Sequence, residues 1–188
     1  IFSGNGKYRG FDVLSTANNH SFDMGEAGVH STIQFLQKKG IAWCGTTSNS
    51  EERNHITMIE RKGISIAFLA YTFSLNKHAL PADKEWLCNH LQLNTEDADI
   101  STIVADAKQA RLIGADIVVA ALHMGCAYQV YPNMHTVHNM HRICKQANID
   151  IILGGHPHNM QPLEILETTD EATGITKQHF ISYSQGDF

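Results

Sequence analysis

The sequence predicts an α/β domain, built as a mixed sheet or a two-sheet sandwich with helices on the outside. Three short apolar runs support this, at residues 10–14, 114–119 and 148–153, because continuous apolar runs bounded by turn residues are typical of buried strands. Amphipathic segments lie between them, and strands that alternate with helices indicate an α/β fold. Each run also leads into a histidine, so the carboxyl ends of the strands are the expected place for a ligand.

The first half of the chain is expected to contain one helix and a hairpin. Residues 25–39 predict a helix that ends at Gly40, and residues 41–44 predict a short strand. The apolar stripe of this helix consists of Val29, Ile33 and Leu36. A hairpin is expected over 55–61 and 64–71, with the Lys-Gly dipeptide between them as its turn, since the second arm is continuously apolar.

The second half begins with a long excursion over residues 72–94, where the hydrophobic periodicity is weak; such excursions in compact domains are often functional. Thr95 is the expected N-cap of a helix over about 96–113, and a further helix is expected over about 134–147. Their apolar stripes are Ile100, Ile103, Val104 and Ala107 in the first helix and Val137, Met140, Cys144 and Ala147 in the second. Residues 163–184 contain β-like runs and are expected to add antiparallel strands.

Composition and charge exclude several classes of protein. The 188 residues are 43% hydrophobic and 18% charged, which is ordinary for one folded domain. A net charge of -5 with dispersed lysines and arginines argues against a nucleic-acid-binding groove. No apolar run approaches the roughly 20 residues that span a bilayer. The four cysteines form no CxxC pair, which argues against a structural zinc site, and Cys44 and Cys144 are expected to be buried.

The sharpest local pattern is the pair His156 and His158, which follows two glycines at the end of an apolar run. A turn at the end of a strand can direct two such imidazoles at a metal centre, whereas a surface loop with two incidental histidines is the alternative. His123 follows another apolar run, and it is either a metal ligand or a hydrogen-bonded histidine at a strand end. Neither segment decides the question alone.

The first apolar run leads into Asn18, Asn19 and His20, a segment in which paired asparagines more often cap a turn. The joint occurrence changes the interpretation, because three separate strand exits carry histidine. We therefore expect four histidines, His20, His123, His156 and His158, and an amide to gather at the carboxyl edge of the sheet, as a metal-dependent hydrolytic site requires.

His135, His138 and His141 form a competing cluster, since they are spaced by three along the helix expected over 134–147. Such a row can chelate a metal on a helix surface. The three residues lie off the apolar stripe, and nothing else in the segment supplies ligands. We therefore interpret them as part of a solvated polar face.

Several segments resemble motifs of one known family. Residues 15–25, STANNHSFDMG, are similar to its "ANNHxxDxG" motif, and residues 63–72 are similar to its central strand. Residues 123–125, HMG, resemble "HWG"; residues 155–164 resemble "GxHPHxxQPxE"; residues 183–188, YSQGDF, resemble the closing "YSLGNF". The motifs follow in the same order along nearly the whole chain, which resembles the CapA family of capsule and poly-gamma-glutamate biosynthesis proteins.

The resemblance implies the calcineurin-like metallophosphatase superfold, an α/β/β/α sandwich with a two-metal centre that clamps a phosphoryl group. It implies that one ion is held by Asn19, His123 and His156 and the other by His158. By the same resemblance His20 is the general acid that assists the leaving group, and Asp23 orients it. The implied cofactor is one or more divalent metal ions, with Mn, Zn or Fe as candidates.

The chain departs from the family pattern in ways that bear on the number of ions. The family's opening strand, with a "GD" aspartate that bridges the ions, has no counterpart before Ile1, so we interpret residues 1–188 as one domain of this fold that lacks its N-terminal strand or strands. Met124, Ala127 and Asp187 stand where the family has Trp, Glu and Asn. Four neutral ligands suit a single borderline ion, so we expect this chain to bind at most one ion tightly and to hydrolyse generic phosphoesters poorly.

From the resemblance we expect a protein of bacterial capsule or poly-gamma-glutamate biosynthesis with a metal-dependent, hydrolase-type site. The alternative is a non-catalytic component that binds or exports an anionic polymer through the same cleft. The expected partners are an anionic polymer or a phosphoester substrate, together with other capsule-synthesis components, and no nucleic acid. The resemblance places such a protein in the cell envelope, outside the cytoplasm, with any membrane anchor beyond this chain. Lys77, His78 and Lys84 in the excursion are too few cations to choose between the two functions.

Overall fold

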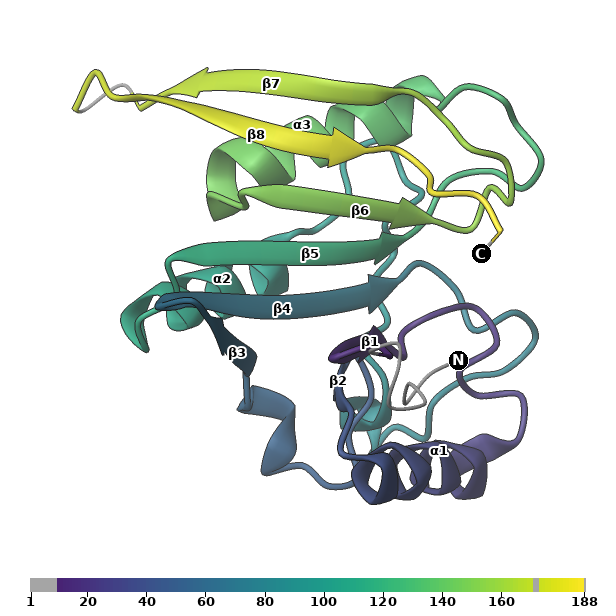
Figure 1. Cartoon of the computed structure of the whole chain (residues 1–188). Helices are drawn as coiled ribbons and strands as arrows, with labels where there is room; N and C mark the ends of the chain where they lie inside the picture. Colours follow the sequence, from purple (N-terminus) through teal and green to yellow (C-terminus); the bar gives the residue numbers. More distant parts are fainter. Residues whose placement is uncertain (1–9, 171–172, 188) are drawn as a thin grey trace.

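The computed structural model describes residues 10–170 and 173–187, and they form a mixed α/β fold (Figure 1). The elements in chain order are β1 (Val13–Ser15), α1 (Gly25–Lys39), β2 (Ala42–Cys44), η1 (Glu52–Asn54), β3 (Thr57–Arg61), β4 (Ile64–Thr72), η2 (Glu85–Leu87), α2 (Ser101–Leu112), β5 (Ile117–His123), α3 (Met134–Ala147), β6 (Ile151–Gly155), β7 (Leu163–Thr169) and β8 (Thr176–Ser182). No helix among these described residues is long and apolar enough to cross a membrane.

The main sheet has six strands in the order β3-β4-β5-β6-β8-β7. Its four central strands run parallel, and the antiparallel strands β3 and β7 lie at the two edges. The strands β1 and β2 form a separate two-stranded parallel sheet, which lies next to β4 at one end of the main sheet (Figure 1). The expected α/β class is confirmed, with both a mixed sheet and a second small sheet.

Two hydrophobic cores hold these layers together. Helices α2 and α3 pack on one face of the main sheet, and their buried side chains join those of β4, β5 and β6, including Ile103, Val118, Met140 and Ile152. Helix α1 packs against the small sheet through Val29 and Ile33, which meet Ala70 from the other face of β4. The strand β4 therefore separates the two cores, because its side chains alternate between its faces.

The parallel strands end in register. Thr72, the last residue of β4, pairs with His123 at the end of β5, and His123 pairs with Gly155 at the end of β6. All three strands therefore end together, and this carboxyl edge of the sheet, formed by the strand ends, carries the histidine segments that follow β5 and β6 (Figure 1). Parallel strands place their carboxyl ends together in this way.

At the opposite edge, an ionic network joins the starts of β5 and β6. Asp150 accepts hydrogen bonds from Arg111, from Lys177 and from the backbone amide of Val118. Burial alone would raise the pKa of Asp150, but these donors outweigh it and hold that pKa below its ordinary value. Arg111 also donates to the backbone oxygens of residues 115, 116 and 148. The segments that lead into β5 and β6 are therefore both hydrogen-bonded to this one charged side chain.

Most sequence predictions of elements are confirmed, including the helix over 25–39 with Gly40 in the left-handed conformation that ends it. The helix over 134–147 and the hairpin turn are also confirmed. The predicted N-cap at Thr95 is wrong, because α2 begins only at Ser101. The Thr95 hydroxyl donates to the Gln92 oxygen instead, and the Asp99 carboxylate accepts the hydrogen bond of the Ser101 amide.

Candidate functional site

Three histidines meet where β5 and β6 end. The ring centroids of His123 and His156 lie 5.1 Å apart, and those of His156 and His158 lie 6.2 Å apart. Gly155 allows this approach, since a Cβ built on it would lie 3.3 Å from Nδ1 of His123. Phe73, from the exit of β4, packs edge-on against His156 at 4.7 Å and gives the cluster an apolar flank.

The loop after β1 adds an amide to this cluster. Oδ1 of Asn19 lies 2.9 Å from Nε2 of His123, although the two residues are 104 positions apart in the chain. The loop is held by its own side chains, because Oδ1 of Asn18 accepts from the His20 amide and the hydroxyl of Ser21 accepts from the Asn18 amide. The structure therefore brings Asn19, His123, His156 and His158 together at one sheet edge.

His20 lies beside the cluster and is paired with Asp23. Its Nδ1 lies 2.7 Å from Oδ2 of Asp23, and the His20 side chain is 67% exposed. A carboxylate on Nδ1 fixes the orientation of the ring and favours a proton on that nitrogen, which leaves Nε2 directed elsewhere. A partly exposed imidazole with one nitrogen held is suited to proton transfer.

His158 has two neighbours of different kinds. Its Nδ1 lies 2.7 Å from Oδ1 of Asp187, so the residue that replaces the family's Asn does place a carboxylate at the cluster. The ring of Tyr128 stacks on the imidazole, with centroids 5.1 Å apart and planes 16° apart. The amide of Tyr128 donates to the Pro157 oxygen, which fixes the tyrosine over the turn that carries both histidines.

The inner two histidines are neutral near pH 7. Burial, together with the nearby imidazoles of His156, His158 and His20, lowers the pKa of His123 to about 4. Burial, followed by the imidazoles of His158 and His20, also lowers the pKa of His156. The lowered pKa values favour neutral imidazole, which is the form that can bind a metal ion.

Backbone strain gathers at this edge. Six non-glycine residues in the described part of the chain have positive φ, and four of them belong to the site: Asn76, Tyr128, His156 and His158. His156 has φ 96°, a value that a residue with a Cβ rarely adopts. Strained residues persist only where the surroundings hold them, and they cluster at functional sites.

The donor atoms at the site are of types that bind metal ions, although the side chains are not arranged as a metal site. Among residues 10–170 and 173–187, no group of three or more His, Cys, Asp or Glu side chains is placed so that it could hold a metal ion. Nδ1 of His156 is buried without a hydrogen-bond partner within that same part of the chain, which is costly unless another group satisfies it. Two neutral imidazoles, a third beside them and an amide oxygen are ligands that borderline ions such as Zn or Mn accept.

The structure adds residues that sequence reasoning missed. Nδ2 of Asn76 donates to the backbone oxygen of Asn19, and its Oδ1 accepts from Nδ2 of Asn19. The side chain of Asn94 accepts from the Gly125 amide and donates to the Gly125 oxygen, which fixes the turn after His123. Both asparagines lie in the 72–94 excursion, whose length and irregular composition were the available signal.

The helix histidines are only partly solvated, which corrects one expectation. His138 is exposed and lies 3.2 Å from Asp97, in agreement with a polar face. His141 instead lies 2.9 Å from Oε2 of Glu164 and 3.1 Å from the hydroxyl of Tyr183, so it packs between α3 and the strands β7 and β8. The spacing places the residue on the helix but cannot show that two strands cover that turn. The predicted burial of Cys44 and Cys144 is confirmed.

Known proteins resemble this chain over nearly its whole length. The family model described as bacterial capsule synthesis protein PGA_cap matches residues 5–188. The PGA biosynthesis protein CapA of Bacillus subtilis (strain 168) is 30% identical over 188 residues, which are 95% of this chain and 42% of that protein. The capsule biosynthesis protein CapA of Bacillus anthracis is 28% identical over 182 residues, which are 97% of this chain and 41% of that protein. The chain thus spans about two fifths of the length of these relatives.

Proposed function

Because the chain belongs to the bacterial capsule synthesis family PGA_cap, we propose that its histidine cluster is a metal-dependent, hydrolase-type site that acts in the biosynthesis of a capsule polymer such as poly-gamma-glutamate. The observation that carries this proposal is the convergence of Asn19, His123 and His156 from three strand exits. Purely structural histidines would have no common reason to meet there in the neutral state.

We assign the binding of the ion to the cluster itself. Asn19, His123 and His156 would hold it, and His158 would approach from the outer side of the turn. The ion would supply Lewis-acid polarisation of a phosphoryl or carbonyl oxygen. Asp187 contributes a negative charge to the same edge through its contact with His158, which supports cation binding by an otherwise neutral set.

His20 and Asp23 would supply the proton. Asp23 holds Nδ1 of His20, so Nε2 is the nitrogen left to donate a proton to a leaving group. The amide of Asn76 lies 3.5 Å from Nδ1 and limits the ring from the other side. This arrangement resembles a general acid held in one orientation, and it leaves the ligand nitrogens to other residues.

The fold we propose is the metallophosphatase-like sandwich. The six-stranded sheet would be one layer, and the β1–β2 pair would be part of the second layer, since it packs against β4 on the face opposite α2 and α3. This assignment is consistent with a metal site at the carboxyl edge that both layers supply. The names of the relatives support an association of the protein with the cell envelope, where capsule polymers are made.

Metal titration tests the site directly. Isothermal calorimetry with Zn²⁺ and Mn²⁺ on the wild-type chain should give one tight ion, with affinity reduced by roughly 100-fold or more in H123A and in H156A. The control is H135A, which removes an exposed histidine from α3 and should change nothing. Equal affinities in all four proteins would refute the site, and two tight ions in the wild type would overturn the single-ion assignment.

Hydrolysis of bis(p-nitrophenyl) phosphate tests the role of His20. H20A should lose hydrolysis while elemental analysis shows unchanged metal content, because proton donation needs a nitrogen free of the ion. Loss of metal in H20A would place the residue among the ligands instead. A metal-loaded protein that binds poly-gamma-glutamate but hydrolyses nothing would favour the alternative function, a non-catalytic component that binds or exports an anionic polymer.

A further inference from the structure

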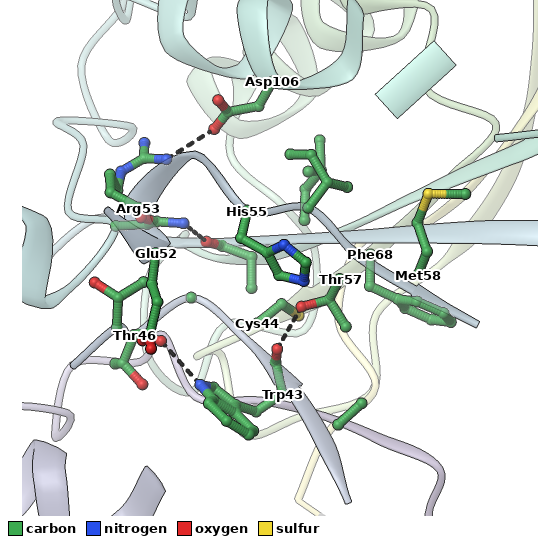
Figure 2. Close-up of a pocket in the computed structure, with 17 residues that line it drawn as sticks. Trp43, Cys44, Thr46, Glu52, Arg53, His55, Thr57, Met58, Phe68 and Asp106 are labelled. Carbon is green, nitrogen blue, oxygen red and sulfur yellow. Dashed lines mark hydrogen bonds and ion pairs between the residues drawn. The ribbon is translucent and has the colours of Figure 1, made fainter. Parts of the chain in front are cut away.

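A cavity lies between β2, β3 and β4 (Figure 2). It has a volume of about 450 Å³, which suits a small organic molecule. None of Asn19, His123, His156 or His158 lines it, so it is separate from the candidate metal site. Its lining joins a tryptophan, a methionine and a phenylalanine to an arginine and two acids.

The topology creates this cavity. The strand β3 pairs with β4 only as far as Phe68, so the last four residues of β4 extend beyond their neighbour. The chain that precedes β3 swings away through η1, which leaves a space between η1 and β4. Gly45 belongs to the lining and packs closely against its neighbours, since a Cβ there would lie 2.6 Å from Cβ of Ala17 and 3.1 Å from Cβ of Ala70.

The apolar wall is held in a fixed position. The indole Nε1 of Trp43 donates to the Thr46 oxygen, and the hydroxyl of Thr57 donates to the Trp43 oxygen. In Figure 2 the side chains of Phe68 and Met58 lie at one end of the cavity, and Arg53 with Asp106 lies at the other. A ligand would therefore have an apolar body at one end and a polar group at the other.

At the polar end of the cavity, the two acids already accept hydrogen bonds from the protein, whereas the arginine has donors to spare. Asp106 accepts from the Tyr71 hydroxyl at 2.7 Å and from Nη1 of Arg53 at 3.3 Å, and Glu52 accepts from the amide and hydroxyl of Ser48. Both acids are thus occupied by donors of the protein. Within the described residues the guanidinium of Arg53 bonds to Asp106 alone, although it carries five N–H donors.

Asn89 also lines the cavity, but its side chain offers nothing that a ligand could reach. Its Nδ2 donates to the Ala70 oxygen, and its Oδ1 is buried. The free hydrogen-bonding capacity of the cavity therefore belongs to the guanidinium of Arg53.

The chemistry of the lining favours binding over catalysis. Burial raises the pKa of the Cys44 thiol to about 12, so this cysteine is protonated and a poor nucleophile. Burial and the adjacent Asp106 raise the pKa of Tyr71, which keeps its phenol as a neutral donor. A dianionic phosphate would face both Glu52 and Asp106, whereas a single carboxylate matches the guanidinium fork.

We propose that this cavity binds a small organic monocarboxylate, with the carboxylate on Arg53 and the apolar body against Trp43, Met58 and Phe68. The proposal stands independently of the hydrolase assignment.

The test compares two probes by NMR titration. N-acetyl-phenylalanine has the carboxylate, the apolar ring and an amide donor, and N-acetyl-phenylalanine amide lacks only the carboxylate. The acid should bind about tenfold or more tightly than the amide, with amide shifts at residues 42–47 and 53–58 and none at residues 123 and 156. Equal binding of the two probes, or no shift at millimolar concentration, would overturn the proposal.

Variants of the full chain sharpen this test. R53K keeps a cation beside Asp106 but loses the fork, so it should weaken the acid probe about tenfold and leave the amide probe unchanged. R61K, at an exposed arginine paired with Asp12 outside the cavity, is the matched control. A42L fills the cavity from β2 and should abolish binding of both probes even if R53K proves unstable; retained binding in A42L would place the ligand elsewhere.

Discussion

The two ends of the strands β5 and β6 are built on opposite principles. At their starts, Asp150 is bonded by Arg111, Lys177 and a backbone amide, so opposite charge and hydrogen bonding together outweigh the cost of its burial. At their ends, His123 and His156 are partly buried with lowered pKa values, one ring nitrogen has no partner within the described residues, and the backbone is strained. The first end stabilises the fold, and the second end uses that stability to hold an unfavourable arrangement.

The largest expected effect is a loss of stability on substitution of Gly154, which should far exceed the loss on substitution of its neighbour Gly155. A Cβ on Gly154 would lie 2.1 Å from the Tyr183 oxygen, so G154A should lower the free energy of unfolding by about 3 kcal/mol or more. Gly155 faces only Nδ1 of His123 at 3.3 Å, so G155A should cost less than about 1 kcal/mol while it displaces the imidazole. Urea unfolding measures both.

Metal titration of G155A completes that comparison. Weakened Zn²⁺ binding with nearly normal stability would show that the close approach serves the site. Equal destabilisation by the two substitutions would show that the carboxyl end of β6 is as important for folding as its start, and would break the contrast.

The next effect belongs to the ionic network. D150N keeps the size of the side chain but removes its charge from beside Arg111 and Lys177, so the free energy of unfolding should fall by about 2 kcal/mol. The affinity for Zn²⁺ should not change, because Asp150 lies at the other edge of the sheet. Chemical denaturation and calorimetry on the same sample measure both quantities; a matching loss of metal affinity would contradict the separation.

The acid dependence of stability gives a smaller signal from the same residue. The folded-state pKa of Asp150 lies below its unfolded value of about 3.9, so its contribution is full above that value and is lost as the pH falls through the folded-state pKa. The difference in unfolding free energy between wild type and D150N should therefore be constant from pH 7 to 5 and shrink below about pH 4. A difference that grows on acidification would mean that the carboxylate is not stabilised in the fold.

The smallest effect concerns strain at the carboxyl end. Tyr128 has φ 63° and is 72% exposed, so Y128N, which tolerates that conformation better, should raise the free energy of unfolding by up to about 1 kcal/mol. Y131N is the matched control, because Tyr131 is 70% exposed and lacks a positive φ; it should change stability by less than about 0.5 kcal/mol. Thermal unfolding measures both. A destabilised Y128N would indicate that stacking on His158 outweighs the strain.

Sequence patterns predicted the histidines at the strand ends better than the loop residues that contact them. Parallel strands place their carboxyl ends at one edge, so the two runs that became β5 and β6 were enough to bring His123 and His156 together. The run over residues 10–14 was expected in the same sheet but forms β1 of the small sheet. The role of Asn76 could not be predicted, because it depends on the path of an irregular segment that crosses the Asn19 loop. Tyr128 was missed because positive φ is expected of glycine and asparagine, not of tyrosine.

The helices show the same division. The bounds of α1 could be predicted from its apolar stripe and from Gly40, the one residue after the stripe that readily adopts the left-handed conformation of a helix end. The start of α2 was misplaced because Thr95, Asp97 and Asp99 all have side chains that can cap, and tertiary packing selects among them. The metal, the substrate and the sandwich assignment rest on family membership and on the experiments above, not on periodicity.

The register of Thr72, His123 and Gly155 also bears on how such a protein can diverge. Residues added to the connections before α2 or α3 leave this row where it is. A single residue added inside β5 reverses the faces of every later side chain in that strand and carries His123 away from its neighbours. Longer loops are therefore compatible with the site, whereas a changed length of β5 is not.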